Sequence, residues 1–236
     1  EELKEQVTKK LKNNNNISTS VLDNRYSDTL KFKKMADPYF PILVGIPGLS
    51  IPAYDPVWLE ATLLEPDLIR DHYMYQAEQA VQCIRYLNKK GFKLLKGGGD
   101  LASNSGPIFS PDTFKKLILP SLKKVAAECD KLDMFYGYST DGKIWSITDY
   151  IFEEGGAQAY FEVDRSAGMT VGKLREKYPD LVIVNNISSQ KMHNGNEEEV
   201  REETRSTLEE SGGYNYIPGP STAVMSGTPV ENVYAV

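Results

Sequence analysis

From residue 40 onward, short apolar runs alternate with longer segments of helical spacing. The apolar runs predict buried strands, which lie at 40–46, 92–95, 134–138, 158–163, 181–184 and 214–217. The segments between and after them predict helices at 55–90, 111–132, 144–154, 170–178, 197–210 and 229–236. Pro66 and Pro120 are expected to interrupt the first two helical segments. Strands that alternate with helices predict right-handed βαβ crossovers and a parallel sheet.

The predicted fold class is α/β, a parallel (β/α)8 TIM-barrel type over residues 40–236. About six strand–helix units are predicted, so the first two of the eight units of a closed barrel are expected to be lacking. An open, doubly wound sheet is the structural alternative. The glycine-rich turn at 97–99 does not support it, because it lacks GxGxxG spacing and Asp100 would face a phosphate unfavourably.

The first 39 residues predict a separate amino-terminal extension, part helix and part linker. Leu3, Val7 and Leu11 form a narrow apolar stripe that predicts a helix over 1–12. The four asparagines at 13–16 are expected to end it, and the mixed polar segment 13–38 predicts a linker or a loosely packed extension. The first residue is glutamate rather than methionine, so we expect a processed product or a fragment of a longer chain.

Composition and charge exclude several classes of function. The net charge of −6 and the pI of about 5.1 disfavour nucleic acid as a partner, because neutralising phosphates needs a basic surface. No apolar run approaches the roughly 18 residues of a membrane span. The two cysteines, Cys83 and Cys129, lie in predicted helices and are interpreted as core thiols. This cysteine usage favours a reducing, cytoplasmic location over a disulfide framework.

Acidic residues follow three of the predicted strands, where a parallel barrel forms its active site. They are Asp100, Asp141 and Asp164. Together they predict an acidic mouth that either binds a metal through oxygen ligands or holds one carboxyl group at a raised pKa for proton transfer. A structural role stays open for each: Asp100 as a loop cap, Asp141 as part of a turn with glycine, and Asp164 as the partner of a surface base.

Other polar residues at the strand ends are predicted to contact a small-molecule substrate. They are Tyr138, Ser139, Lys143, Asn186 and Ser221. For Asn186, satisfying loop backbone groups is the alternative. His72 and His193 are interpreted as surface residues, and no Ser–His or Cys–His pair is suggested by position. No metalloprotease, P-loop or EF-hand motif occurs.

Five segments in a fixed order carry a resemblance to a known family. They are VGIPGLSIPA at 44–53, the Gly-Asp, Gly-Pro and Ser-Pro run at 97–125, the Asp-Gly strand end at 136–156, the segment 164–188, and 210–236 with its closing TPVENVYAV. They resemble the uroporphyrinogen decarboxylase and corrinoid-dependent methyltransferase superfamily. The resemblance implies a TIM barrel and one of two activities. Its decarboxylases act on a tetrapyrrole without metal, whereas its methyltransferases use a metal, usually zinc, and exchange a methyl group with a corrinoid protein.

The chain departs from both patterns. The Gly-His-Gly of decarboxylases is replaced by Gly219-Pro220-Ser221, and the His-x-Cys of thiol methyltransferases by Ser139-Thr140-Asp141. A thiolate-bound zinc site is therefore excluded within this chain. The surviving similarity is to methoxy-group methyltransferases, which place an acid before Ala-Gly-Met, here Asp164 before 167–169.

The leading hypothesis is a methyltransferase that moves a methyl group between a small methoxylated or methylated substrate and a corrinoid carried by a partner protein. Asp100, Asp141 and Asp164 would be catalytic, with Asp141 and Asp164 holding a divalent metal such as zinc or polarising the substrate oxygen. Tetrapyrrole decarboxylation is the second enzymatic hypothesis. A non-catalytic barrel fragment or binding scaffold is the third. Because a six-stranded remainder has two open edges, we expect them to be covered by the segment 1–39, by a second copy of the chain in a homodimer, or by polypeptide that is missing from this sequence.

Overall fold

The structure is a computed structural model that describes residues 1–12, 16–37 and 39–236. Most of the predicted asparagine turn, Asn13–Asn15, lies outside the described residues, as does Pro38. The chain divides into two compact units. The first unit contains Glu1–Gly99, Ser110–Gly137 and Asp149–Ala157, and the second contains Asp100–Phe109, Tyr138–Thr148 and Gln158–Val236.

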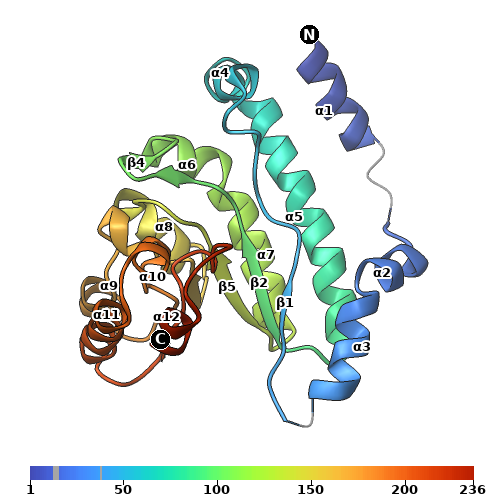
Figure 1. Ribbon diagram of the computed structural model, residues 1–236. Coiled ribbons are helices and arrows are strands. Elements are labelled where there is room, and N and C mark those ends of the chain that lie inside the picture. Colours follow the sequence, from blue (N-terminus) through green and yellow to red (C-terminus); the bar gives the residue numbers. More distant parts are fainter. Residues whose placement is uncertain (13–15, 38) are drawn as a thin grey trace. The chain divides into compact units, whose positions relative to one another are not determined.

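The first unit consists of long helices on a short parallel sheet (Figure 1). Its elements are α1 (Glu2–Lys12), α2 (Thr19–Arg25), α3 (Ser27–Ala36), β1 (Leu43–Gly45), α4 (Pro56–Leu64), α5 (Pro66–Lys89), β2 (Leu94–Gly98), α6 (Pro111–Leu117), α7 (Leu119–Lys131), the first part of β5 (Phe135–Ser139) and most of α8 (Thr148–Phe152).

Helix α5 is the centre of the first unit and packs against α1, α4, α6 and α7 (Figure 1). Its apolar positions recur at three- and four-residue spacing and are buried, for example Ile69, Tyr73, Ala77 and Ile84. β1 and β2 pair in parallel from Leu43↔Leu94 to Gly45↔Lys96. The predicted helix breaks are confirmed, since Pro66 begins α5 and Pro120 lies in the first turn of α7.

Residues 16–37, for which the polar composition predicted a linker or a loosely packed extension, mostly form the helices α2 and α3. Ser18 caps α2 by accepting a hydrogen bond from the Val21 N–H. Tyr26 stacks on Tyr86 of α5 with ring centroids 5.9 Å apart, and the Tyr86 hydroxyl donates to Asp23 at 2.5 Å. Sparse apolar residues were therefore enough for helix formation, because α5 supplies the surface that buries them.

The second unit contains most of the predicted strand ends. Its elements are β3 (Ala102–Ser103), β4 (Gly106–Pro107), the end of β5, the 3₁₀ turns η1 (Trp145–Ile147) and η2 (Arg165–Ala167), β6 (Ala159–Phe161), α9 (Val171–Lys177), β7 (Val182–Val184), α10 (Ser189–Asn194), α11 (Glu197–Glu210), β8 (Tyr216–Ile217) and α12 (Val230–Tyr234). β6, β7 and β8 pair in parallel through Tyr160↔Ile183 and Ile183↔Tyr216. The β3–β4 hairpin and α10 were not predicted from the sequence.

The described residues carry the six strands predicted for the parallel sheet. Their order is β1-β2-β5 in the first unit and β5-β6-β7-β8 in the second. β1, β6, β7 and β8 are shorter than the apolar runs that predicted them; β6, for example, keeps only the middle of the run 158–163. β2 and β5 instead extend further toward their carboxyl ends than predicted. The fold class is α/β with a mostly parallel sheet, of the TIM-barrel type, as predicted.

The histidines differ from their predicted surface positions. His72 is buried in α5, and His193 lies on α10, half-buried, with Nδ1 3.3 Å from the Thr228 hydroxyl. The prediction of core thiols is confirmed, because Cys83 and Cys129 are buried and free. Among the described residues, no helix has the length and apolar character needed to cross a bilayer.

Candidate active site

The turn after β5 places Asp141 against the β3–β4 hairpin. Gly142 has a φ of +74°, and a Cβ added there would lie 2.8 Å from the Ser103 carbonyl oxygen, so this position requires glycine. The Lys143 N–H donates to the Ser103 carbonyl at 2.9 Å. The Leu101 N–H donates to the Thr140 hydroxyl at 3.4 Å. The Asp-Gly pair is thus a turn, as its alternative interpretation held, and this turn brings Asp141 close to the loop that carries Asp100.

Four acids interact electrostatically at these strand ends. Burial raises the pKa of the Asp141 carboxyl above its ordinary value, and the charges of Asp100, Asp164 and Glu162 raise it further. The same neighbourhood acts on Tyr160 of β6, whose pKa is raised by burial and then by Asp164, Asp141 and Glu162. Three carboxylates around one half-buried carboxyl favour its protonated form. We call Asp100, Asp141, Glu162 and Asp164 the acid cluster.

Glu162 is the member of the acid cluster that sequence reasoning did not nominate. It directly follows β6 and has a φ of +63°, an unusual backbone conformation for glutamate. Left-handed backbone at a non-glycine residue is found at functional sites more often than elsewhere. No periodicity or motif indicates this conformation. Its position near the carboxyl end of the predicted strand 158–163 is the only signal that could have singled it out.

Asp164 has a structural role besides its charge. Its Oδ1 accepts hydrogen bonds from the Ser166 N–H at 2.9 Å, the Ser166 hydroxyl at 2.5 Å and the Ala167 N–H at 3.3 Å. These bonds cap η2. The expected alternative, a pair with Arg165, is not what the structure shows, because Arg165 pairs with Glu210 at 2.6 Å. One carboxylate oxygen of Asp164 is therefore occupied by protein donors.

The described side chains at the acid cluster do not supply the three or four protein ligands of a zinc site. In the part of the chain that the structure describes, no group of three or more His, Cys, Asp and Glu side chains is arranged to hold a metal ion. Zinc sites in proteins need three or four protein ligands, and Asp164 already gives one oxygen to its cap. The predicted metal pair Asp141 and Asp164 stays a prediction, and no step below depends on it.

The five residues predicted to contact a substrate differ in the exposure of their side chains and in their hydrogen bonds. Lys143 is exposed, whereas Tyr138 and Ser139 are buried in β5. Ser221 is buried, and its hydroxyl accepts from the Ser189 N–H at 3.3 Å. Asn186 is fully buried, and its side-chain N–H groups donate to the Val163 and Met169 carbonyl oxygens at 3.1 and 2.7 Å. Among these five residues, only Lys143 has an exposed side chain.

Arg165 is the basic residue adjacent to the acid cluster in sequence, and it is bound to other side chains. Its guanidinium donates to Asn186 at 3.2 Å, to Thr207 at 3.3 Å and to Glu210 at 2.6 Å. Burial alone would raise the pKa of Glu210, but hydrogen bonds from Arg165 and the Gly172 N–H lower it below its ordinary value. The charge of Arg165 is thus matched by Glu210, and the acid cluster keeps its negative character.

The sequence was compared with known protein families to find which of them contains this site. A family model described as uroporphyrinogen decarboxylase (URO-D) matches residues 57–236. The chain belongs to the uroporphyrinogen decarboxylase family. The matched range includes the whole acid cluster, so this cluster is part of the family's barrel-type region in this chain. A comparison with curated proteins gives no match.

A solved structure shares the fold of this uroporphyrinogen decarboxylase family member. It is a methyltransferase from Methanosarcina mazei, with a TM-score of 0.70 and 22% sequence identity. The superposition covers 87% of this chain and 60% of that protein. This chain therefore spans less than two thirds of the length of the methyltransferase that it matches. At this identity the similarity supports the fold, and the chemistry has to be argued from the site.

Proposed function

We propose that this member of the uroporphyrinogen decarboxylase family transfers a methyl group from a small methoxylated or methylated substrate to a corrinoid carried by a partner protein. The observation that carries the proposal is Asp141, a half-buried carboxyl at a strand end with three acids around it. Such a carboxyl is held in its protonated form at a higher pH than an exposed aspartate. It is suited to give a proton to a substrate oxygen.

The chemistry divides between the partner and this chain. A reduced corrinoid would supply the nucleophile that accepts the methyl group. When the methyl–oxygen bond of a methoxylated substrate breaks, its electron pair stays on the oxygen, and Asp141 donates its proton to that oxygen. The departing group then leaves as a neutral hydroxyl compound rather than as an alkoxide. Asp100, Glu162 and Asp164 contribute by keeping Asp141 protonated until that step.

The charge of the site favours this substrate class over a tetrapyrrole. A tetrapyrrole with several carboxylates needs cationic partners, whereas the acid cluster is negative and Arg165 is paired with Glu210. The family match is the specific observation in favour of tetrapyrrole decarboxylation. That activity is therefore the second candidate, and incubation of the purified chain with uroporphyrinogen tests it directly.

The main test is a methyl-transfer assay with an Asp141→Asn variant. The purified chain is mixed with a methoxylated aromatic compound and reduced cobalamin, and formation of methylcobalamin is followed by its absorbance spectrum. Loss of a general acid typically lowers a rate by about 10²–10⁴-fold, so we expect a loss of at least about 100-fold. Because the protonated carboxyl is the active form, activity should also fall as the pH rises through the raised pKa of Asp141.

The matched control is Asp133→Asn, the same substitution at an exposed acid in the first unit. It should keep the wild-type rate. A wild-type rate in Asp141→Asn would contradict the proposed role of Asp141. Turnover of uroporphyrinogen without any methyl transfer would favour the second candidate.

A further inference from the structure

One buried side chain holds both ends of the loop that carries Asp164. The Asn186 amide, fully buried at the end of β7, donates to the Val163 carbonyl before Asp164 and to the Met169 carbonyl after it. Between these two anchors lie Asp164 and η2. Two hydrogen bonds from one amide therefore fix the two ends of a seven-residue loop, 163–169, relative to β7.

The amide of Asn186 is itself held in one orientation. Its Oδ1 accepts from the Arg165 guanidinium at 3.2 Å, so both of its N–H groups must face the loop carbonyls. Arg165 is in turn bound to Glu210 of α11, and Glu210 also accepts from the Gly172 N–H at 3.2 Å. A chain of charge-assisted hydrogen bonds thus runs from α11 to the β6 strand end.

The backbone conformation at this position favours glycine, asparagine or aspartate. Asn185 and Asn186 have φ values of +82° and +97°, a region that asparagine enters more readily than most residues. The two side chains serve different loops, because the amide of Asn185 donates to the Pro220 carbonyl. The chain therefore offers two adjacent asparagines with the same backbone conformation and separate targets.

We propose that Asn186, oriented by the Arg165–Glu210 pair, is a positioning residue that holds the Asp164 carboxylate at a fixed place relative to Asp141. This inference rests on the proposed function, since it explains how Asp164 is kept in place near Asp141, the proposed proton donor. It also reassigns Asn186, which the sequence predicted as a substrate contact.

The test compares Asn186→Gly with Asn185→Gly. Glycine tolerates both left-handed conformations, so each variant removes a side chain without straining the backbone. Amide hydrogen exchange of Ser166 and Ala167, the two N–H groups bound to Asp164, reports the loop. Asn186→Gly should remove their protection, whereas Asn185→Gly should leave it unchanged.

A second readout separates positioning from simple structural support. The carboxyl carbon of Asp141 is followed by NMR as the pH is changed. The groups that act on it are Asp100 before β3, Glu162 after β6 and Asp164 in the loop. If Asp164 moves away, one source of repulsion weakens, so the titration of Asp141 should shift to lower pH in Asn186→Gly alone. Loss of stability by itself would not move this titration.

Glu210→Gln covers the case in which Asn186→Gly fails to fold. It keeps the shape of the side chain but removes the charge that holds Arg165. It should therefore cause a smaller loss of amide protection and a smaller shift of the Asp141 titration than Asn186→Gly. Wild-type protection and titration in the variants that fold, or equal changes in Asn185→Gly, would overturn the proposal. Neither readout uses a methyl donor or a corrinoid. The positioning role can therefore hold if methyl transfer fails, and fail if methyl transfer holds.

Discussion

His72 shows how one residue can reverse the expectation from local sequence. It lies beside charged residues in the sequence, yet only 5% of its surface is exposed, and its ring centroid lies 4.9 Å from that of Trp58. Its pKa is lowered from 6.5 to about 4, mainly by burial and also by the charge of Lys10, while a hydrogen bond to the Ser50 backbone opposes the shift. The ring is therefore neutral in the folded chain at pH 5, where it is charged once unfolded.

This difference predicts how stability depends on pH. The unfolded chain takes up a proton at His72 near pH 6.5, but the folded chain does so only near pH 4. The free energy of unfolding should therefore fall as the pH drops between these values, by about 3 kcal/mol in total, with no further loss from this group at lower pH. His72→Phe should flatten this part of the curve in urea unfolding measured from pH 7 to 4. An unchanged slope would show that His72 is not the group responsible.

At the scale of elements, the helices predicted best are those whose ends are marked by residues close together in the sequence. α11 occupies the predicted range, Glu197–Glu210, because Asn196 and Glu199 form a capping box at its start. α10 was missed because its six residues are too few for a periodic pattern. It forms because Ser188 caps it and Met192 is buried with Ile187 and Val200.

The capping box gives a prediction at this scale. Asn196→Ala removes the acceptor for the Glu199 N–H and should lower the free energy of unfolding by about 1 kcal/mol. Glu199→Gln keeps a side-chain acceptor for the Asn196 N–H, so it should cost much less. Urea denaturation of both variants at neutral pH provides the comparison. Equal losses in the two variants would mean that the charge of Glu199 contributes as much to this end of the helix as the Asn196 cap does.

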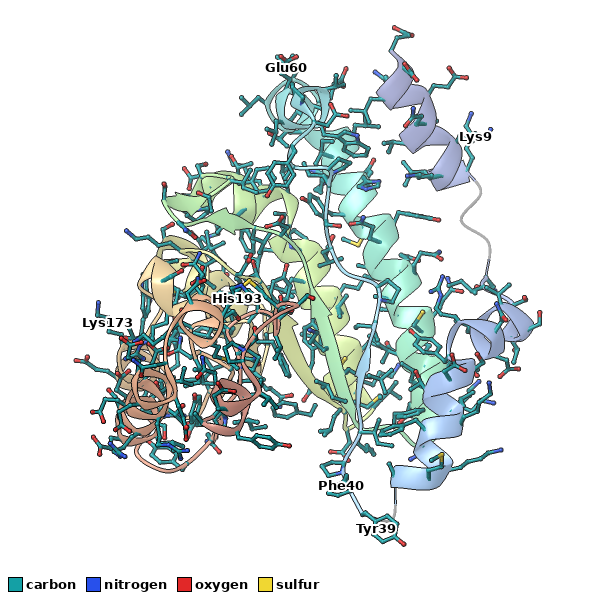
Figure 2. All side chains as sticks on the ribbon, in the orientation of Figure 1. Lys9, Tyr39, Phe40, Glu60, Lys173 and His193 are labelled. Atoms are coloured by element: carbon teal, nitrogen blue, oxygen red, sulfur yellow. The ribbon has the colours of Figure 1, made fainter. Side chains whose placement is uncertain are left out.

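At the scale of the whole molecule, the first unit contains the terminal strand of the sheet order, and several apolar side chains on or near this strand are exposed. β1 is the first strand in the sheet order. Tyr39 and Phe40 project from the segment between α3 and β1 (Figure 2), with 76% and 68% of their surface exposed, and Leu43 of β1 is 43% exposed. Exposed strand edges with apolar side chains favour pairing with another chain.

We therefore predict a homodimer that depends on β1. Leu43→Lys places a charge on the edge, which should oppose pairing and lower the average mass measured by analytical ultracentrifugation. Leu64→Lys adds the same charge at an exposed position on α4 and is the control. A monomeric wild-type chain, or equal effects of the two substitutions, would contradict this prediction.

The sequence by itself determined the alternation of strands and helices, the parallel fold class and the acids at the strand ends. These depend on apolar periodicity and on residues close together in the chain, such as the Asp-Gly turn at 141–142. Only the tertiary structure decided which strand-end residues lie close together and which of them are already hydrogen-bonded to other groups of the protein. Asn186 and Arg165 are hydrogen-bonded to groups up to 45 residues away in the chain. Glu162 belongs to the acid cluster through a backbone conformation that no local pattern indicates. Burial and charge at Asp141 arise from segments that meet only when the chain folds.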